Sequence, residues 1–210
     1  MFVTSCAGVK VLKSFSLYKV PVLWAVSVLL ASQVYSPRAN AVPTVNALDL
    51  GRYLGKWYEV ASIPAWFQKK CVKNTTAEYS SLDFGRIDVV NSCDKADGSL
   101  NVANGVAHVV NTTTNAELEV SFVPLLSFFG WFSGQYKVIA LGANYEYSVV
   151  GDDTLGFGWI LSRTPSLPLQ TLVDLEKKIS AVGYDSCQFL MSLQDGAAIT
   201  TRTPLCQIVR

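Results

Sequence analysis

The chain has 210 residues, half of them hydrophobic, a length compatible with one domain that holds a full core. It carries 17 basic and 16 acidic residues, and this near-balance of charge gives no attraction for nucleic acid. The only histidine is His108, which excludes any catalytic or metal site that needs two histidines.

The first 48 residues contain no Asp or Glu and have the pattern of a targeting sequence. Three lysines precede an apolar stretch, residues 20–34, and small residues follow up to Ala41. We therefore expect a signal or transit peptide over residues 1–41, cleaved after Ala41, and one domain over residues 42–210. A transmembrane anchor is the competing interpretation, but polar residues interrupt the stretch, which is shorter than the ~20 residues that a span needs.

Loss of the leader would remove four cations and leave 13 basic and 16 acidic residues, a formal charge of −3. An acid-poor leader is consistent with three routes of export. The sequence therefore predicts an exported protein that is secreted, periplasmic and associated with an outer membrane, or held in the thylakoid lumen of a plastid.

Eight short runs of alternating apolar and polar residues follow, separated by turns rich in Gly, Asp and Asn. Eight strands of even spacing predict an all-β protein, an eight-stranded up-and-down antiparallel β-barrel whose interior can hold one small ligand. The expected strands are residues 56–63, 75–82, 86–92, 100–110, 116–123, 136–141, 146–151 and 157–162.

One helix is predicted after the last of these strands. Leu172, Leu175, Ile179 and Val182 recur at steps of three and four, with a proline near the start of the segment and a glycine just past its end. We expect this C-terminal α-helix to pack on the outside of the barrel, followed by a short strand within residues 189–193.

Two motifs a hundred residues apart indicate how the barrel closes. Gly55-Lys56-Trp57-Tyr58-Glu59 opens the first strand, and Trp159-Ile160-Leu161-Ser162-Arg163-Thr164-Pro165 ends the last. A guanidinium of Arg163 lying flat over the indole of Trp57 would close one end and contribute roughly 0.5–2 kcal/mol. This combination resembles the lipocalins, and in particular the branch of bacterial outer-membrane lipocalins, apolipoprotein D and temperature-induced plant lipocalins, over residues 49–194.

The resemblance implies a function and a set of ligand residues. Lipocalins of this branch bind small hydrophobic molecules, and the connections at residues 64–74, 93–99, 124–134 and 151–156 would surround the open end. The pocket residues of apolipoprotein D match Tyr79, Asn91, Phe122, Tyr136 and Trp159. Such aromatic walls suit an apolar ligand, whose polar end Asn91 and the Tyr79 hydroxyl would orient. Side chains that simply fill a tight core are the alternative.

Glu59 shares the strand parity of Trp57 and is expected to face inward as well. A buried carboxylate needs a partner. We expect a structural partner, an Arg or a Tyr near the closed end, rather than a catalytic role.

Four cysteines remain after the leader, and an even number behind an export signal predicts two disulfides. We favour Cys71 with Cys93 across neighbouring strands and Cys187 with Cys206. The alternative pairs Cys71 with Cys206 and Cys93 with Cys187, because the cysteine of apolipoprotein D that matches Cys71 binds the C-terminal tail. A metal site is disfavoured, since no Cys-x-x-Cys spacing is present.

The segment from Pro124 to Phe132 is too apolar for an ordinary surface loop. It could be a lid over the cavity, a contact in a homodimer or a tip that touches a membrane, and the resemblance favours peripheral membrane contact. The residues that would make this contact are Leu125, Leu126, Phe128, Phe129, Trp131 and Phe132.

No motif of an enzyme is present, neither Gly-x-Ser-x-Gly nor a phosphate loop, and no cofactor is implied. We expect a carrier or storage protein for a fatty acid, lysophospholipid, sterol or pigment-like molecule, not an enzyme. Two alternatives remain: a lipocalin-fold enzyme that acts on a lipid or xanthophyll, and a filled barrel with a structural or membrane-protective role.

Overall fold

The computed structural model describes residues 41–122 and 133–210. The predicted leader, apart from Ala41, and the predicted apolar loop at residues 124–132 lie outside the described residues. Residues 39–210 form one compact unit.

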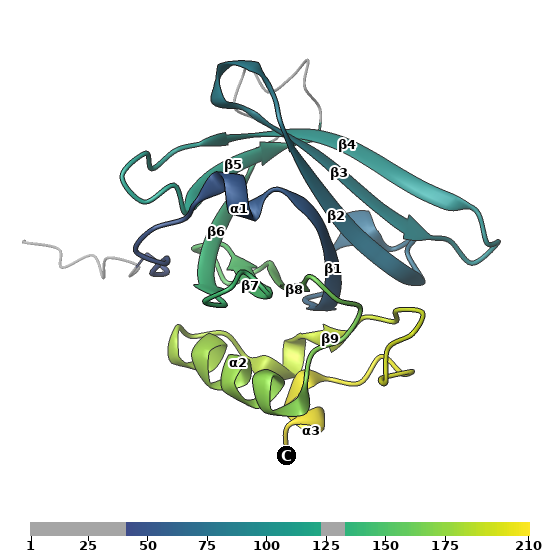
Figure 1. Ribbon diagram of the computed structural model, residues 1–210. Helices are drawn as coiled ribbons and strands as arrows, with labels where there is room; N and C mark the ends of the chain where they lie inside the picture. The colour runs from purple at the N-terminus through teal and green to yellow at the C-terminus, as the bar shows by residue number, and fades with distance from the viewer. Residues whose placement is uncertain (1–40, 123–132) are drawn as a thin grey trace, which may run out of the picture. The chain divides into compact units, whose positions relative to one another are not determined.

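Eight antiparallel strands close into a barrel, as the sequence predicts (Figure 1). Each strand pairs with the next along the chain, β8 pairs with β1, and β1 pairs with β2 to close the circle. The strands are β1 (Gly55–Ser62), β2 (Lys73–Ser81), β3 (Ile87–Asp94), β4 (Leu100–Val109), β5 (Glu117–Ser121), β6 (Ser133–Leu141), β7 (Tyr147–Gly151) and β8 (Gly158–Ser162).

The strand bounds differ from the expected ones most at β6, which begins three residues earlier than predicted. Gly134 and Gln135 lack the branched or aromatic side chains typical of a strand. They pair nevertheless with the second half of β5. The neighbouring strand supplies hydrogen-bond partners for their backbone, and this pairing overrides local preference.

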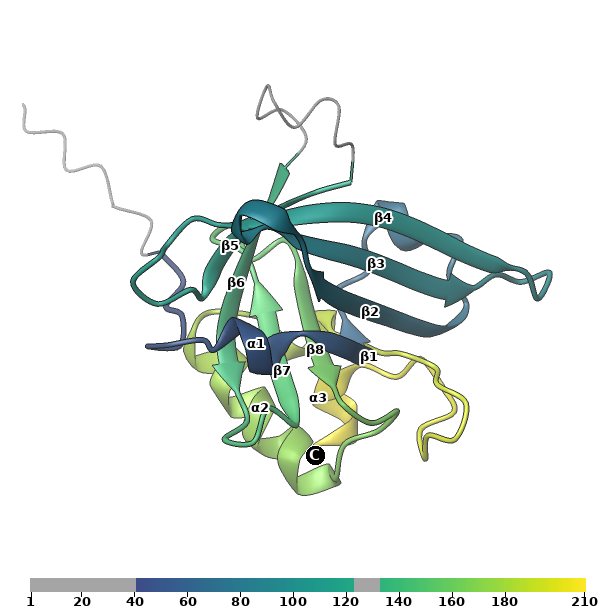
Figure 2. The ribbon, with the colours of Figure 1, turned by 45° about the horizontal axis from the view of Figure 1, so that its top comes forward.

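Helix α2 (Leu169–Ala181) covers the outside of the barrel beside β6 and β7, as predicted (Figures 1 and 2). Its three fully buried side chains, Leu172, Leu175 and Ile179, pack with outward-facing residues of the barrel wall, including Val149 and Ile160. The interface between α2 and the outer wall of the barrel is therefore a second hydrophobic core, separate from the core inside the barrel.

Short elements flank the barrel. Before β1, helix α1 (Leu50–Tyr53) starts where the carboxylate of Asp49 accepts a hydrogen bond from the Arg52 amide. After α2 come the expected short strand, β9 (Leu190–Met191), which pairs with β1, and an unpredicted helix, α3 (Leu205–Ile208). The part of the chain that the structure describes also contains the 3₁₀ helices η2 (Trp66–Gln68), η3 (Asp83–Gly85) and η5 (Ser186–Gln188).

Both disulfides follow the pairing that the sequence favours. Cys71 is bonded to Cys93, and Cys187 to Cys206. The first ties the connection after η2 to the end of β3, and the second ties η5 to α3. These cross-links indicate an exported protein, because disulfides persist in oxidising compartments. Among the described residues, we find no helix with the length and apolarity to cross a membrane.

Candidate functional site

One end of the barrel is closed by Arg163, which follows β8. Its guanidinium carbon lies 3.7 Å from the centre of the Trp57 ring, so the predicted stack is present. Trp57 is completely buried and donates its indole N–H to the Tyr53 carbonyl at 2.8 Å. The guanidinium also donates to the carbonyls of Arg52 (2.8 Å), Tyr53 (3.2 Å), Leu54 (3.0 Å) and Lys56 (2.9 Å). Arg163 therefore caps the last carbonyls of α1 as well as the barrel.

Three tyrosines form a layer above this closed end. The Tyr136 hydroxyl lies 2.7 Å from the Tyr53 hydroxyl and 2.9 Å from the Tyr79 hydroxyl, and Tyr53 also contacts the Ser148 hydroxyl at 2.9 Å. Burial raises the pKa of Tyr53 to about 12 and that of Tyr136 well above its ordinary value. A space of only about 10 Å³ remains between these tyrosines and the apolar side chains around them, so the layer is tightly packed, and we call it the tyrosine floor.

The inner face above the tyrosine floor carries residues that are not fully buried. Residues that face each other across neighbouring strands point to the same side of the sheet. Asn91 pairs with Ala77, and Trp159 pairs with Val150; because Ala77 and Val150 belong to the interior core, Asn91 and Trp159 lie on the inner face. Ala103 pairs with Asn91 and so faces inward as well. Asn91, Ala103, Tyr136 and Trp159 all keep part of their surface exposed although they face inward. A side chain added at Gly134 would meet no atom within 4 Å. Small residues and residual exposure thus distinguish the upper half of the barrel from the more deeply buried tyrosine floor.

All five residues that the resemblance implies as ligand contacts lie on the inner face. Tyr79 and Tyr136 meet in the floor, while Asn91 on β3, Phe122 after β5 and Trp159 on β8 stand at separate points around the upper half. Phe122 is 39% exposed, and its ring covers Gly105 of the neighbouring strand so closely that a Cβ there would lie 2.9 Å from it.

The side-chain oxygen of Asn91 is the unusual polar atom of this interior. It is buried and accepts no hydrogen bond from any described residue. A buried polar atom without a partner costs about 1–3 kcal/mol, so such atoms point to a partner outside the protein chain. A ligand hydroxyl or N–H donor would satisfy it.

An aromatic cluster stands at the open end. Phe157 and Trp159 are parallel to within 4° with ring centres 6.1 Å apart, and Phe67 of η2 lies 6.0 Å from Phe157. Trp66 packs edge-on against Phe67 at 5.5 Å and is 74% exposed. These rings form an apolar surface at the rim of the barrel.

Residues 48–194 match the family model of the lipocalin-like domain. The chain belongs to the lipocalin family. It is 35% identical to the outer membrane lipoprotein Blc of Escherichia coli over 159 residues, which are 75% of this chain and 86% of Blc. Mouse apolipoprotein D is 35% identical over 152 residues, 68% of this chain and 75% of that protein.

Solved structures agree on the fold. Lobster apocrustacyanin A1 superposes with a TM-score of 0.55 at 19% identity, covering 73% of this chain and 91% of that one. Lipocalins bind and transport small hydrophobic molecules. The family thus agrees with the open, aromatic interior of this barrel.

The carboxylate of Glu59 faces inward in this lipocalin, but the prediction that an Arg or a Tyr is its partner was wrong. It is 5% exposed and accepts hydrogen bonds from Ser62 (2.9 Å), Gln68 (2.7 Å) and Ser192, not from an Arg or a Tyr. The bulge of β1 after Glu59 directs this part of the strand toward β9, and the segment after β9 supplies Ser192. The hydrogen-bond partners of Glu59 therefore depend on packing between distant segments, which no local sequence pattern indicates.

A cavity of about 160 Å³ adjoins this carboxylate, between β1, the η2 segment and the residues after β9. Its volume is below the roughly 300 Å³ at which cavities begin to hold drug-sized ligands. Among the described residues, no group of three or more His, Cys, Asp or Glu side chains is placed to hold a metal ion.

Several site residues were missed by the sequence analysis. Phe157 has the same parity as Trp159 and could have been found by counting along β8. Tyr53, Phe67 and Gln68 lie outside the predicted strands, in short helices without a periodic signal. Gln68 connects two parts of the site, because its oxygen accepts from the Trp159 indole N–H at 3.4 Å while its N–H₂ group donates to Glu59.

Proposed function

We propose that this lipocalin carries or stores an elongated or ring-bearing apolar molecule in the upper half of its barrel, with one polar donor of that molecule on Asn91. Fatty acids, lysophospholipids, sterols and pigment-like molecules have this chemistry. The unsatisfied oxygen of Asn91 carries the proposal, since among the described residues it is the one buried side-chain nitrogen or oxygen without a hydrogen-bond partner. Phe122, Tyr136 and Trp159 would supply the apolar wall around it.

The interior supports a carrier rather than an enzyme. A general acid or base needs a titratable group within reach of the substrate. The inward-facing carboxylate of Glu59 already accepts hydrogen bonds from three side chains, and His108 lies on the outer face, half exposed, 3.4 Å from Glu119. Neither group is free to act on a molecule bound above the tyrosine floor.

A polar contact of this kind can be tested with two probes that differ in one donor. A long-chain alcohol and its methyl ether are titrated against the protein, and quenching of Trp fluorescence is followed. The parent should prefer the alcohol by about three- to tenfold, because one hydrogen bond contributes about 0.5–1.5 kcal/mol. Asn91→Leu should bind both probes equally.

Two outcomes would contradict this view of the site. If neither probe, nor a lysophospholipid, quenches the fluorescence of the parent, the barrel is not a carrier of such molecules. If Trp159→Phe shows the same quenching as the parent, Trp159 does not line the site.

We further propose that the open end contacts a membrane, which would let an apolar ligand enter without crossing water. Supporting this, Trp66 and Phe67 are exposed at that end, and the sequence of residues 125–132 is too apolar for an ordinary surface loop. A mature charge of −3 disfavours electrostatic attraction to anionic lipid, so binding should depend little on salt.

Liposome flotation tests the membrane contact. A Phe128→Asp, Trp131→Asp double variant should lose flotation and keep ligand binding, because burial of large apolar side chains contributes about 1.5 kcal/mol or more each. Phe84→Asp is the matched control, since Phe84 is 96% exposed but lies in the turn between β2 and β3 at the closed end. A double variant that still floats but changes from dimer to monomer would show that the loop is a dimer contact instead.

A further inference from the structure

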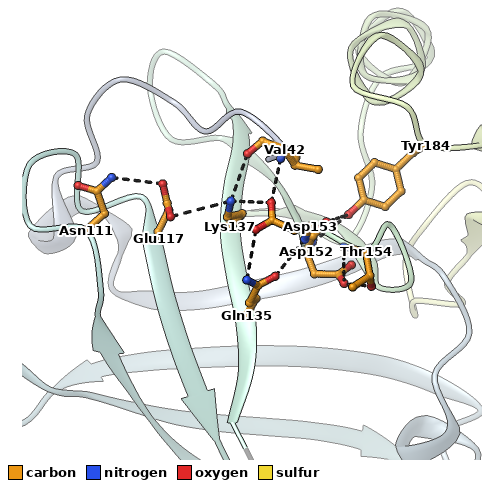
Figure 3. Close-up of polar contacts among 9 residues, drawn as sticks. All are labelled: Val42, Asn111, Glu117, Gln135, Lys137, Asp152, Asp153, Thr154 and Tyr184. Carbon is orange, nitrogen blue, oxygen red and sulfur yellow. Dashed lines mark hydrogen bonds and ion pairs between the residues drawn. The ribbon is translucent and has the colours of Figure 1, made fainter. Parts of the chain in front are cut away.

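The first described residues are tied to the outside of the barrel by a polar cluster (Figure 3). Val42, the residue directly after the predicted cleavage site, is 4% exposed. Its backbone N–H donates to a carboxylate oxygen of Asp153 at 2.8 Å, and its carbonyl accepts from the Lys137 ammonium at 3.4 Å. Ala41, on the other side of the predicted cleavage site, is exposed.

The charges around this nitrogen do not balance. Lys137, whose side chain is only 7% exposed, lies 2.6 Å from Asp153 and 3.9 Å from Glu117, so one cation serves two carboxylates. The nearby carboxylate of Asp152 turns away, because it accepts from the amides of Thr154 and Phe157. The cluster that faces the Val42 nitrogen therefore carries one uncompensated negative charge, and a second cation there would neutralise it.

The carboxylate of Asp153 is oriented and ionised, as binding of a second cation requires. The Gln135 side chain donates to one oxygen of Asp153 at 3.2 Å and accepts from the Asp153 amide at 3.1 Å. Burial alone would raise the pKa of Asp153, but the hydrogen bonds from Lys137, Val42 and Gln135 outweigh burial and leave the pKa below its ordinary value. Asp153 is thus ionised at neutral pH and fixed in orientation.

We propose that Asp153 binds the free α-ammonium group of Val42 after the leader is removed, and that this ion pair locks the N-terminal segment onto the barrel. Hydrolysis of the Ala41–Val42 peptide bond by a processing peptidase consumes one water and leaves a carboxylate on Ala41 and an amine on Val42. The amine is protonated at neutral pH, so an amide with one N–H becomes a cation with three. It forms at the nitrogen that already contacts Asp153.

The segment that would be locked has a structural role. The amide of Val45 donates to the Val138 carbonyl at 2.9 Å, and that of Leu48 donates to the Thr114 carbonyl at 2.7 Å. The Leu48 side chain is 2% exposed and belongs to the interior core. Fixing Val42 would therefore hold the chain that brings Leu48 into the barrel.

The test compares two products cut from the full chain by a sequence-specific protease. One version carries the protease site directly before Val42, and the other carries it four residues earlier, so that both lose the leader but only the first begins at Val42. The product that begins at Val42 should have the higher urea midpoint at pH 7, with a folding equilibrium constant about tenfold larger, as expected for a pKa raised by one unit. Equal midpoints would overturn the proposal.

Two controls identify the partner. Asp153→Asn should erase the difference between the two products, whereas Asp195→Asn, which removes a carboxylate paired with Lys73 elsewhere, should preserve it. Selective acetylation of the Val42 amine, which leaves Asp153 intact, should lower the midpoint to that of the extended product. A midpoint that is insensitive to acetylation would overturn the proposal even if Asp153→Asn fails to fold.

The pH dependence has a defined sign. An unfolded α-amino group has a pKa near 7.7–8.0, and Asp153 and Glu117 should raise it in the folded protein, against the opposing charge of Lys137. A group whose pKa is raised on folding contributes its full stability below the unfolded pKa. The advantage of the product that begins at Val42 should therefore be complete just below about pH 7, where Asp153 is still ionised, and disappear as the pH rises through the folded pKa of the amine. A stability advantage of this product that grows as the pH rises would contradict the proposed ion pair.

Discussion

Arg163→Ala is expected to lower the free energy of unfolding by about 2–4 kcal/mol. The substitution removes the cation over Trp57 and exposes the fully buried indole to water. It also removes the donors for four carbonyls at the end of α1 and the start of β1. Urea denaturation followed by tryptophan fluorescence measures the change.

Arg163→Lys separates the two contributions. A lysine keeps the charge but has neither the planar face that stacks on an indole nor the fork that reaches several carbonyls, so its stability should lie between those of the parent and the alanine variant. An unchanged midpoint for Arg163→Ala would show that the closed end does not depend on this residue.

Ala103→Trp is expected to reduce affinity for an apolar ligand at least tenfold. Ala103 faces the interior opposite Asn91, and a tryptophan would occupy the space above the tyrosine floor that we propose for the ligand. Each buried CH₂ of a ligand contributes about 0.8 kcal/mol, so excluding two of them accounts for a factor of about ten. Titration with a fatty acid, followed by competition with a fluorescent lipid probe, measures the affinity.

The matched control for this variant is the next residue along β4. Asn104 is exposed and faces outward, so Asn104→Trp adds the same side chain to the same strand without entering the barrel. It should bind the ligand as the parent does. Equal affinities for the two variants would mean that the ligand does not occupy the upper half of the interior.

The two ends of this barrel differ in how far their inner faces are buried. Near the closed end the tyrosines pack with Trp57 and with small residues such as Ala77 in one buried core, and the tyrosine hydroxyls satisfy one another. Toward the open end, Ala103 and Trp159 keep part of their surface exposed. Small barrels can be packed solid by their own side chains. Here full burial of the inner face is confined to the part near the closed end.

The sequence by itself determined the barrel, its closure and its outer helix, because these depend on local patterns. Period-2 alternation fixes which side chains face inward, steps of three and four fix the buried stripe of α2, and the Trp57 and Arg163 motifs identify the closed end. The disulfide pairing was favoured for the same reason, since neighbouring strands bring Cys71 and Cys93 together.

Only the tertiary structure decided the partners of the buried polar groups. Ser192 reaches Glu59 across 133 residues, and Asp153 reaches Val42 across 111, through strand pairing and a bulge that leave no periodic trace. The unsatisfied oxygen of Asn91 is likewise invisible in sequence, because its lack of a partner depends on every neighbouring strand. Parity determines which side of the sheet a side chain occupies, whereas hydrogen-bond partners depend on distances of about 3 Å between segments far apart in the chain.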